Sequence, residues 1–217
     1  MDVYLNDKTS CNTNKGNSPA YETGMTTSAP PSGNLKVHKL QNTWILWFIN
    51  TNPNKSWKDM ILKNGSFNTV EDFWSLYYRT EPPSKLKNGS DYMLFKENIP
   101  PMWEDPVNKN GGRWLISINQ NLSKNHLDII WLDVLLCLIG EACDNCDEIC
   151  GAAVRIRKKN NKIAVWTKNG NDEEAILEIG HKLHELVRLE GTLQLQYQHH
   201  FKEEMGSDVM HILKVSK

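Results

Sequence analysis

The chain has 217 residues, of which 39% are hydrophobic and 24% charged, and its formal net charge is −1. This length suits one large domain or two small ones. A charge so close to zero excludes a molecule that is basic as a whole, so any nucleic-acid site must be local. The composition also excludes collagen-like or wholly low-complexity sequence. Tryptophan is unusually common, with eight residues against six tyrosines and five phenylalanines.

The sequence lacks the marks of a membrane or secreted protein. Its longest apolar run, residues 129–139, is interrupted by Asp133, whereas a spanning helix needs about 20 apolar residues. The N-terminus does not resemble a signal peptide. The five cysteines are odd in number and four lie between residues 137 and 150, unlike an extracellular disulfide framework. We expect no membrane segment and a cytoplasmic location, and leave a second, nuclear location open.

The predicted elements follow a polar N-terminal segment. Residues 1–34 contain no Phe, Ile or Trp and are predicted to form a disordered tail, with a folded domain over residues 35–217. A strand is predicted at 43–51, a helix at 69–79, short strands at 92–95 and 113–118, and a longer helix at 125–141. A hairpin at 152–158 and 162–168, a helix at 172–190 and a strand at 192–198 complete the order. Because strict βαβ alternation is absent, we predict an α+β fold with one antiparallel sheet and helices on one face.

Two of these helices have more apolar positions than one buried stripe requires. In the helix at 125–141, Leu132 and Leu136 form a pair four residues apart outside the main stripe. In the helix at 69–79, Val70 and Trp74 do the same. Either the helices pack side by side and bury both faces, or the extra pairs form an exposed patch for a partner helix. Periodicity alone leaves both interpretations open.

Two tryptophans lie in loop-like sequence. Trp57 and Trp103 each follow a segment rich in Asn and Pro, where a large ring either covers the edge of a core or stacks on a planar ligand. Glu104 directly follows Trp103 and can accept two parallel N–H donors, as the Watson–Crick edge of guanine presents and that of adenine does not.

A basic segment adds to this pattern. Residues 151–168 include Arg155, Arg157 and Lys162 and no acidic side chain. The two arginines alternate on a predicted strand and point the same way, with Lys162 across the turn. Stacking rings, a carboxylate and a basic cluster suit a guanine nucleotide, and a cationic base would strengthen stacking on indoles.

Six short motifs occur in order along the chain: Trp44-x-x-Trp47-Phe48, Asp72-Phe73-Trp74, Pro101-Met102-Trp103-Glu104-Asp105, Gly111-Gly112-Arg113-Trp114, residues 135–141 and Cys150-Gly151-Ala152. Together they resemble the eukaryotic translation initiation factor 4E family, which binds the mRNA 5′ cap. The resemblance extends over residues 37–198 and implies a curved antiparallel sheet with three helices on its convex face and a cap-binding slot on its concave face. Both stacking positions are Trp, as in the main class of the family.

The resemblance also implies the roles of single residues at the cap. Trp57 and Trp103 would sandwich the 7-methylguanine, while Glu104 pairs with its N1 and N2 groups. Trp166 would contact the N7-methyl group. The phosphates would be bound by Arg157 and Lys162, with Arg113 assisting through water.

A second implied site lies on the helices. It would bind Tyr-x4-Leu-hydrophobic helices of the scaffold factor 4G, as in the initiation factor 4F complex, and of 4E-binding repressors. Asp133 replaces the usual Glu of the family, Lys39 replaces Pro after His38, and the C-terminal segment diverges from about residue 199. The family's phosphorylated serine falls on Val209, with Ser207 nearby. The implied partner residues are His38, Val70, Trp74, Leu132, Asp133 and Leu136.

Other interpretations are weighed against this one. A cap-binding translational repressor with weak scaffold coupling, motivated by Asp133 and Lys39, is an alternative within the same class. A reader of methyl-ammonium peptides, using the tryptophans as a cage, is an alternative of another class. The clustered cysteines have irregular spacing with acidic neighbours, and His181 and His184 lie in no metalloprotease order. We therefore expect no catalytic residues, no metal and no cofactor.

Overall fold

The structure is a computed structural model that describes residues 36–50, 56–119, 124–189, 193–200 and 210–214, except for the side chains of Trp57, Lys58 and Lys124. The chain divides into two units, Met1–Leu35 and Lys36–Lys217, and only the second is described. The predicted tail at 1–34 lies outside the described residues, as do Ser207 and Val209. The domain boundaries therefore stay predictions.

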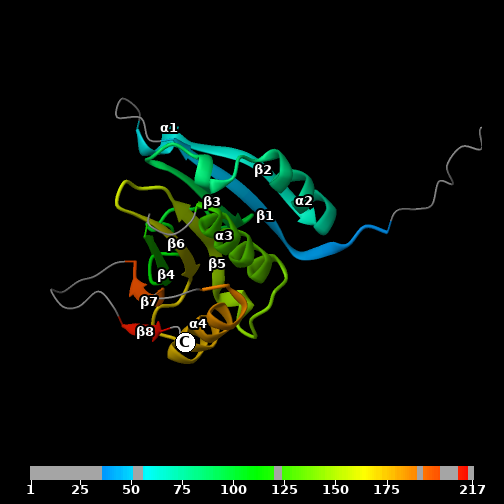
Figure 1. Cartoon of the computed structure of the whole chain (residues 1–217). Helices are drawn as coiled ribbons and strands as arrows, with labels where there is room; N and C mark the ends of the chain where they lie inside the picture. Colours follow the sequence, from blue (N-terminus) through cyan, green and yellow to red (C-terminus); the bar gives the residue numbers. More distant parts are fainter. Residues whose placement is uncertain (1–35, 51–55, 120–123, 190–192, 201–209, 215–217) are drawn as a thin grey trace, which may run out of the picture. The chain divides into compact units, whose positions relative to one another are not determined.

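One antiparallel sheet organises the folded unit (Figure 1). In the described part of the chain it has eight strands in the order β2-β1-β3-β5-β6-β4-β7-β8, and all neighbours pair antiparallel. This confirms the predicted α+β fold with a curved antiparallel sheet. The strands are β1 (Lys39–Asn50), β2 (Ile61–Thr69), β3 (Ser90–Lys96), β4 (Gly112–Asn119), β5 (Ile149–Arg155), β6 (Asn160–Thr167), β7 (Gln194–His199) and β8 (His211–Lys214).

Three long helices match the predicted ones, and shorter pieces join them. The long helices are α2 (Val70–Arg79), α3 (Lys124–Ile139) and α4 (Glu173–Leu186). The short elements are α1 (Trp57–Met60) and two 3₁₀ turns, η1 (Pro83–Lys85) and η2 (Cys146–Glu148). The capping motif predicted at Thr69 is confirmed, because Thr69 Oγ1 accepts a hydrogen bond from Asp72 N at 3.0 Å.

Several boundaries differ from the prediction. Helix α4 ends at Leu186, four residues before the predicted end, because Val187 turns to an extended conformation and becomes buried. Helix α3 ends at Ile139 because Glu141 adopts a left-handed conformation, with φ of 50°. Strands β2 and β8 were not predicted; β2 is rich in Asn, Ser and Gly, and β8 is only four residues long. Both lie at sheet edges, where pairing on one side suffices to hold a weak strand.

The two faces of the sheet are covered differently. On one face, strand residues such as Trp44, Leu94 and Val154 join side chains of α2, α3 and α4 in the large core, and we call this the helical face. On the other, a smaller cluster of strand residues includes Met93, Phe95 and Trp166, and none of the described residues of α2, α3 or α4 contributes to it. We call this second, concave side the open face.

Candidate functional site

The open face carries rows of side chains that cross neighbouring strands. One row pairs Arg113 on β4 with Trp166 on β6. Two residues along each strand, Ala153 and Ala164 form a floor of small side chains. Another two residues along lies the charged row, in which Lys162 on β6 pairs with Arg155 on β5, and Arg155 with Asp91 on β3. Residues that share a pleat point to the same face, so the sheet brings predicted site residues from separate strands together.

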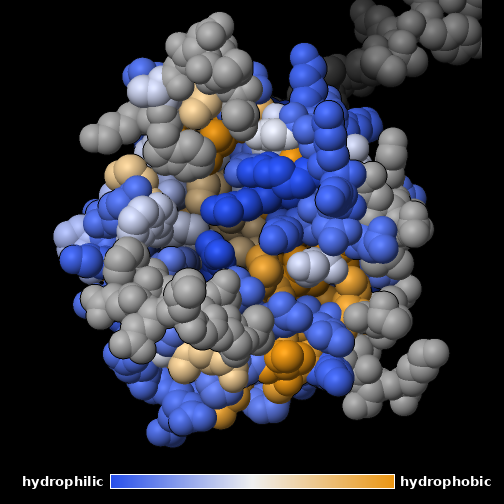
Figure 2. Space-filling model, turned by 90° about the vertical axis from the view of Figure 1, so that its left-hand side faces the viewer, coloured by the Kyte–Doolittle hydropathy of each residue, from blue (hydrophilic) through white to orange (hydrophobic). Residues whose placement is uncertain are grey.

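Seen from the side on which β4 and β6 lie in Figure 1, strongly hydrophilic side chains gather near the middle of the surface, with apolar atoms between them (Figure 2). Such a surface can bind a ligand that combines a flat apolar part with a charged one.

Asp91 is a buried acid that sequence reasoning missed. Its side chain is only 4% exposed, and its carboxylate accepts hydrogen bonds from both terminal nitrogens of Arg157, with Nη2 at 3.0 Å from Oδ2. Arg157 itself follows the end of β5 and does not lie on the strand as predicted. The basic segment contains no acid, but the neighbouring strand β3 supplies one. The sequence did contain a signal, because Asp91 directly precedes the predicted apolar strand at 92–95. A carboxylate buried there needs a partner.

Trp103 and Glu104 lie on an ordered, exposed loop between β3 and β4. The Trp103 ring is 44% exposed, so it does not plug the core, and Glu104 is exposed beside it. Asn108 holds the loop from inside: it is fully buried, and its Nδ2 donates to the carbonyl oxygens of Pro100 at 2.9 Å and Met102 at 2.8 Å. Sequence reasoning missed Asn108, because nothing in its spacing shows that the loop folds around it.

Two connecting segments reach the open face. Ile99, in the loop that leads to Trp103, packs against the open-face cluster, and so does Met60 of α1. Helix α1 begins at Trp57, after Ser56 caps it by accepting from Asp59 N. The Trp57 side chain is outside the described part of the structure, so the sandwich with Trp103 stays a prediction.

His200 is a second residue that sequence reasoning missed. Its ring centroid lies 4.1 Å from that of Trp166, and within the described part of the chain its two buried ring nitrogens have no hydrogen-bond partner. Burial lowers the pKa of His200 to about 3, and the nearby Arg113, Arg155 and His199 act in the same direction. The imidazole is therefore neutral at pH 7.

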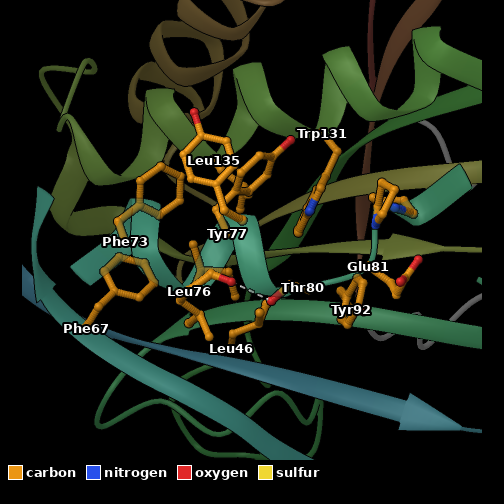
Figure 3. A pocket seen from close by; sticks show the side chains of 14 residues that line it. Leu46, Phe67, Phe73, Leu76, Tyr77, Thr80, Glu81, Tyr92, Trp131 and Leu135 are labelled. Carbon is orange, nitrogen blue, oxygen red and sulfur yellow. Dashed lines mark hydrogen bonds between the residues drawn. The ribbon is translucent and has the colours of Figure 1, made fainter. Parts of the chain in front are cut away.

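The helical face carries the second predicted site. Figure 3 shows Phe73 and Tyr77 of α2 and Trp131 and Leu135 of α3 pointing into a cavity of about 220 Å³ between the two helices and the sheet. Trp74 does not line this cavity; it is half-buried, with its ring 4.9 Å from Phe73 and 5.6 Å from Tyr78.

The extra apolar pairs lie toward solvent rather than in a seam between the helices. Leu136 is 39% exposed, and Val70 and Leu132 are half-buried. We call the two pairs on α2 and α3, together with His38 beside α2, the helical strip. The structure places all the predicted partner residues except Asp133 along it at partly or fully exposed positions.

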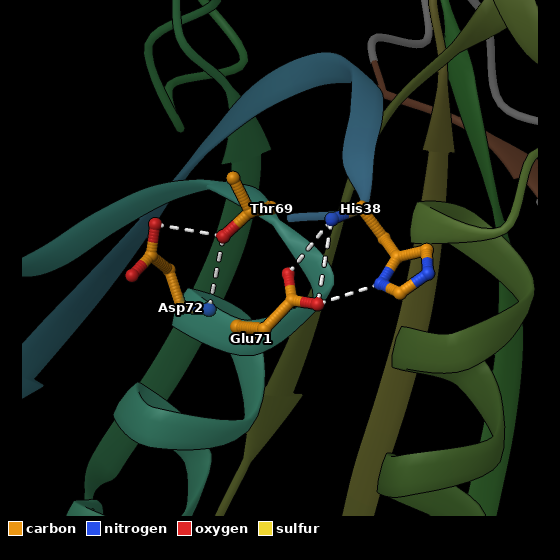
Figure 4. Close-up of polar contacts among 4 residues, drawn as sticks. All are labelled: His38, Thr69, Glu71 and Asp72. Carbon is orange, nitrogen blue, oxygen red and sulfur yellow. Dashed lines mark hydrogen bonds and ion pairs between the residues drawn. The ribbon is translucent and has the colours of Figure 1, made fainter. Parts of the chain in front are cut away.

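His38 is fixed at the start of α2 (Figure 4). Its backbone N–H donates to both carboxylate oxygens of Glu71, and its Nδ1 lies 2.7 Å from Glu71 Oε1. In addition, the His38 carbonyl accepts from Val70 N at 2.9 Å. The hydrogen bond from the His38 side chain lowers the pKa of Glu71. His38 is therefore presented at a defined place at the edge of the helical strip.

Asp133 is held by its own chain. Its carboxylate accepts three hydrogen bonds from Arg188, one from the backbone N at 3.0 Å and two from the guanidinium at 2.9 and 2.7 Å. The Asp133 side chain is 8% exposed, whereas Arg188 is exposed. The group that reaches solvent at this point is the arginine.

Residues 39–212 match the family model described as Eukaryotic initiation factor 4E. The chain belongs to this family. Eukaryotic translation initiation factor 4E1 of Drosophila melanogaster is 54% identical over 204 residues, covering 89% of this chain and 77% of the relative. The resemblance inferred from the sequence motifs is confirmed.

Solved structures of initiation factor 4E agree with the fold. An Ascaris suum eIF4E-3, in complex with the m2,2,7G cap, has a TM-score of 0.78 and 38% identity, covering 82% of this chain and 99% of its own. A C. elegans eIF4E-3, in complex with the 4E-binding protein Mextli and a cap analog, has a TM-score of 0.72 and 42% identity, covering 76% and 94%.

The structure also bears on the metal site, the cysteines and the membrane segment that the sequence analysis considered. Within the described residues, no group of three or more His, Cys, Asp or Glu side chains could hold a metal ion. Cys137, Cys143, Cys146 and Cys150 are buried free thiols, and burial raises the pKa of Cys150 to about 12. Among the helices that the structure describes, none is long and apolar enough to cross a membrane.

Proposed function

We propose that this chain binds the 7-methylguanosine 5′ cap of mRNA and recruits the mRNA for translation initiation through the scaffold factor 4G. The observation that carries the proposal is the exposed Trp103–Glu104 pair, on a loop that Asn108 anchors and that leads into Arg113 at the start of β4. The family membership and the cap complexes of related proteins at 38–42% identity support it.

For each part of the cap we propose a matching group of this chain. Trp57 and Trp103 would stack on the two faces of the methylated base, whose positive charge strengthens stacking on indoles. Glu104 would accept hydrogen bonds from N1 and N2 of the base, and the backbone N–H of Trp103 would donate to its O6. Trp166 would contact the N7-methyl group. Arg157 and Lys162 would bind phosphate oxygens, with Arg113 assisting through water.

The helical strip would bind Tyr-x4-Leu-hydrophobic helices of factor 4G and of 4E-binding repressors. Trp74 and Leu132 pack against the core of the helical face, whereas Trp166 belongs to the cluster of the open face. Cap and partner can therefore be bound at the same time. The complex of a related protein with a 4E-binding protein supports a partner site in this family. The proposed contacts are His38, Val70, Trp74, Leu132, Asp133 and Leu136.

The remaining parts of the proposal concern the whole chain. We infer that residues 1–34 form a disordered tail and that residues 35–217 form the cap-binding domain, with a divergent C-terminal segment from about residue 199. The protein would act by binding, without catalysis, metal or cofactor, and in the cytoplasm.

Fluorescence titration tests cap binding, because ligand stacking quenches tryptophan emission. We expect quenching by 7-methyl-GTP at concentrations where GTP has no effect. A preference for a trimethyl-lysine peptide over 7-methyl-GTP would instead support a methyl-ammonium reader and overturn the proposal. Growth of a strain that lacks its own cap-binding factor, restored by this chain, would separate an initiator from a translational repressor.

A further inference from the structure

The charged row of the open face holds two arginines around one carboxylate. Arg157 occupies both oxygens of Asp91 through its two terminal nitrogens. Arg155 approaches the same carboxylate only through Nε, at 3.9 Å from Oδ2, which is beyond hydrogen-bond distance. Asp91 can neutralise one guanidinium, so this group of three side chains keeps one positive charge.

That remaining charge is best assigned to Arg155. In the described part of the chain, its buried Nε has no hydrogen-bond partner. Burial lowers the pKa of Arg155, yet a guanidinium remains protonated in proteins. A buried donor atom without a partner is costly unless a ligand binds it.

The position of Arg155 allows it to be reached from the open face. Its side chain is 32% exposed. It lies between Asp91 and the exposed Lys162 in the charged row. In the neighbouring row toward Trp166, Ala153 and Ala164 are buried between strand neighbours. Arg155 is therefore four residues along the strands from Trp166, about 13 Å, and it is partly exposed beside Lys162.

We propose that Arg155 contacts the phosphate chain of the capped ligand. The affinity would therefore increase more with the number of phosphates than it would without this arginine. This inference rests on the proposed function and adds a residue to which the family motifs assign no role. A guanidinium matches the paired oxygens of a phosphate better than any group of the base. Asp91 accepts two of the five donors of Arg157, so Arg155 would add donors to those that Arg157 still offers to phosphate.

A purely structural role for Arg155 makes a different prediction. If Arg155 served only to balance Asp91, its loss would disturb the whole site and weaken every ligand by the same factor. If Arg155 contacts phosphate, its loss weakens only ligands that carry phosphates. The effect on 7-methylguanosine, which shares the base but has no phosphate, separates the two roles.

The test titrates the full chain with 7-methylguanosine, 7-methyl-GMP and 7-methyl-GTP by tryptophan fluorescence. For Arg155→Gln we expect the nucleoside to bind within about twofold of the unchanged protein, and 7-methyl-GTP to bind about tenfold more weakly. The slope of log Kd against log salt for 7-methyl-GTP should fall by about one. Arg155→Lys keeps the charge without the planar fork and should lose less.

Lys159→Gln is the matched control, because it removes one positive charge from an exposed position in the turn of the same hairpin. It should change each of the three affinities by less than about twofold. Equal weakening of nucleoside and triphosphate by Arg155→Gln, with the melting temperature lowered, would overturn the proposal in favour of the structural role. Unchanged 7-methyl-GTP affinity in Arg155→Gln, or an equal loss in Lys159→Gln, would also overturn it.

Failure of the cap proposal would look different. In that case the unchanged protein would not distinguish 7-methyl-GTP from GTP. The contribution of Arg155 could still be measured by comparing guanosine with GTP, because that contact does not depend on the methyl group.

Discussion

The helical strip lies on the helices that cover one face of the sheet, and the open face is the other face of the same sheet. The two surfaces are assembled differently. The strip takes apolar side chains from two helices, with pairs four residues apart on each, such as Val70 and Trp74. The open face takes charged and aromatic side chains from separate strands, and its central ion pair joins Asp91 and Arg157, 66 positions apart. Binding at the strip would depend on apolar area, whereas binding at the open face would depend on charge, hydrogen bonds and stacking.

This difference suggests that the two surfaces can be changed independently. The strip is supported by the packing of α2 and α3 on the large core, and the open face by a buried carboxylate and a buried amide. A substitution on one surface should leave binding at the other nearly unchanged. The following experiments test whether the two surfaces bind independently.

The largest effect is expected at Glu104. Glu104→Gln is nearly the same size but turns an N–H donor toward the donors of guanine. It should cost on the order of 2–4 kcal/mol in binding 7-methyl-GTP. Titration of the folded variant measures this, and capture of a Tyr-x4-Leu peptide should be unchanged. Cap affinity within a few-fold of the original would remove Glu104 from the site.

Trp74→Ala tests the strip, and here peptide binding should change while cap binding should not. The half-buried indole should contribute about 2 kcal/mol or more to binding a Tyr-x4-Leu peptide. Its loss should cost less stability than the ~3–5 kcal/mol typical of a core tryptophan, because the side chain is only half-buried. Peptide capture and thermal melting measure the two effects. Loss of 7-methyl-GTP binding, or unfolding, would show that the surfaces are not independent.

Asn108→Ala tests whether the loop must be held rigid. It removes two buried hydrogen bonds, to the Pro100 and Met102 carbonyls, and should weaken 7-methyl-GTP binding by about 1–2 kcal/mol by releasing Trp103 and Glu104. Asn110→Ala, at an exposed position of the same loop, is the control and should have little effect. If both variants bind equally well, the loop does not need its anchor.

The smallest effect on ligand binding is expected at His200, whose burial instead makes the stability of the open face depend on pH. The pKa of His200 is about 3 in the folded protein and about 6.5 in an unfolded chain. Between these two pH values the unfolded state binds more protons than the folded state. The contribution of neutral His200 to the free energy of unfolding is therefore complete above about pH 6.5. It decreases as the pH falls, by at most about 1.4 kcal/mol per pH unit.

Urea unfolding at pH 7.5 and pH 5 measures this dependence. His200→Gln should reduce the difference between the two values, while His181→Gln, at an exposed position on α4, should not. An unchanged difference in His200→Gln would show that the ring is not buried as a neutral group. Peptide binding to the strip should not change with the state of His200.

Much of the fold could be predicted because it follows from local patterns. The capping motif at Thr69, the stripe containing Phe73 and Tyr77, and the hairpin around Asn160 depend on residues within a few positions of one another. The extra pairs on α2 and α3 were visible for the same reason. The weak edge strands β2 and β8 were missed because their pairing with a neighbour, rather than their own composition, makes them strands.

By itself, the sequence determined the family, the alternation of elements and the residue types that a cap would need. Only the tertiary structure decided how these groups are held: Asp91 against Arg157, Asn108 under the Trp103 loop, and Asp133 against Arg188. Each of these contacts joins a buried or half-buried polar group to a partner on another segment. Burial makes an unpaired polar group costly, so its partner is chosen by which segments the fold brings together, and no local spacing records that choice.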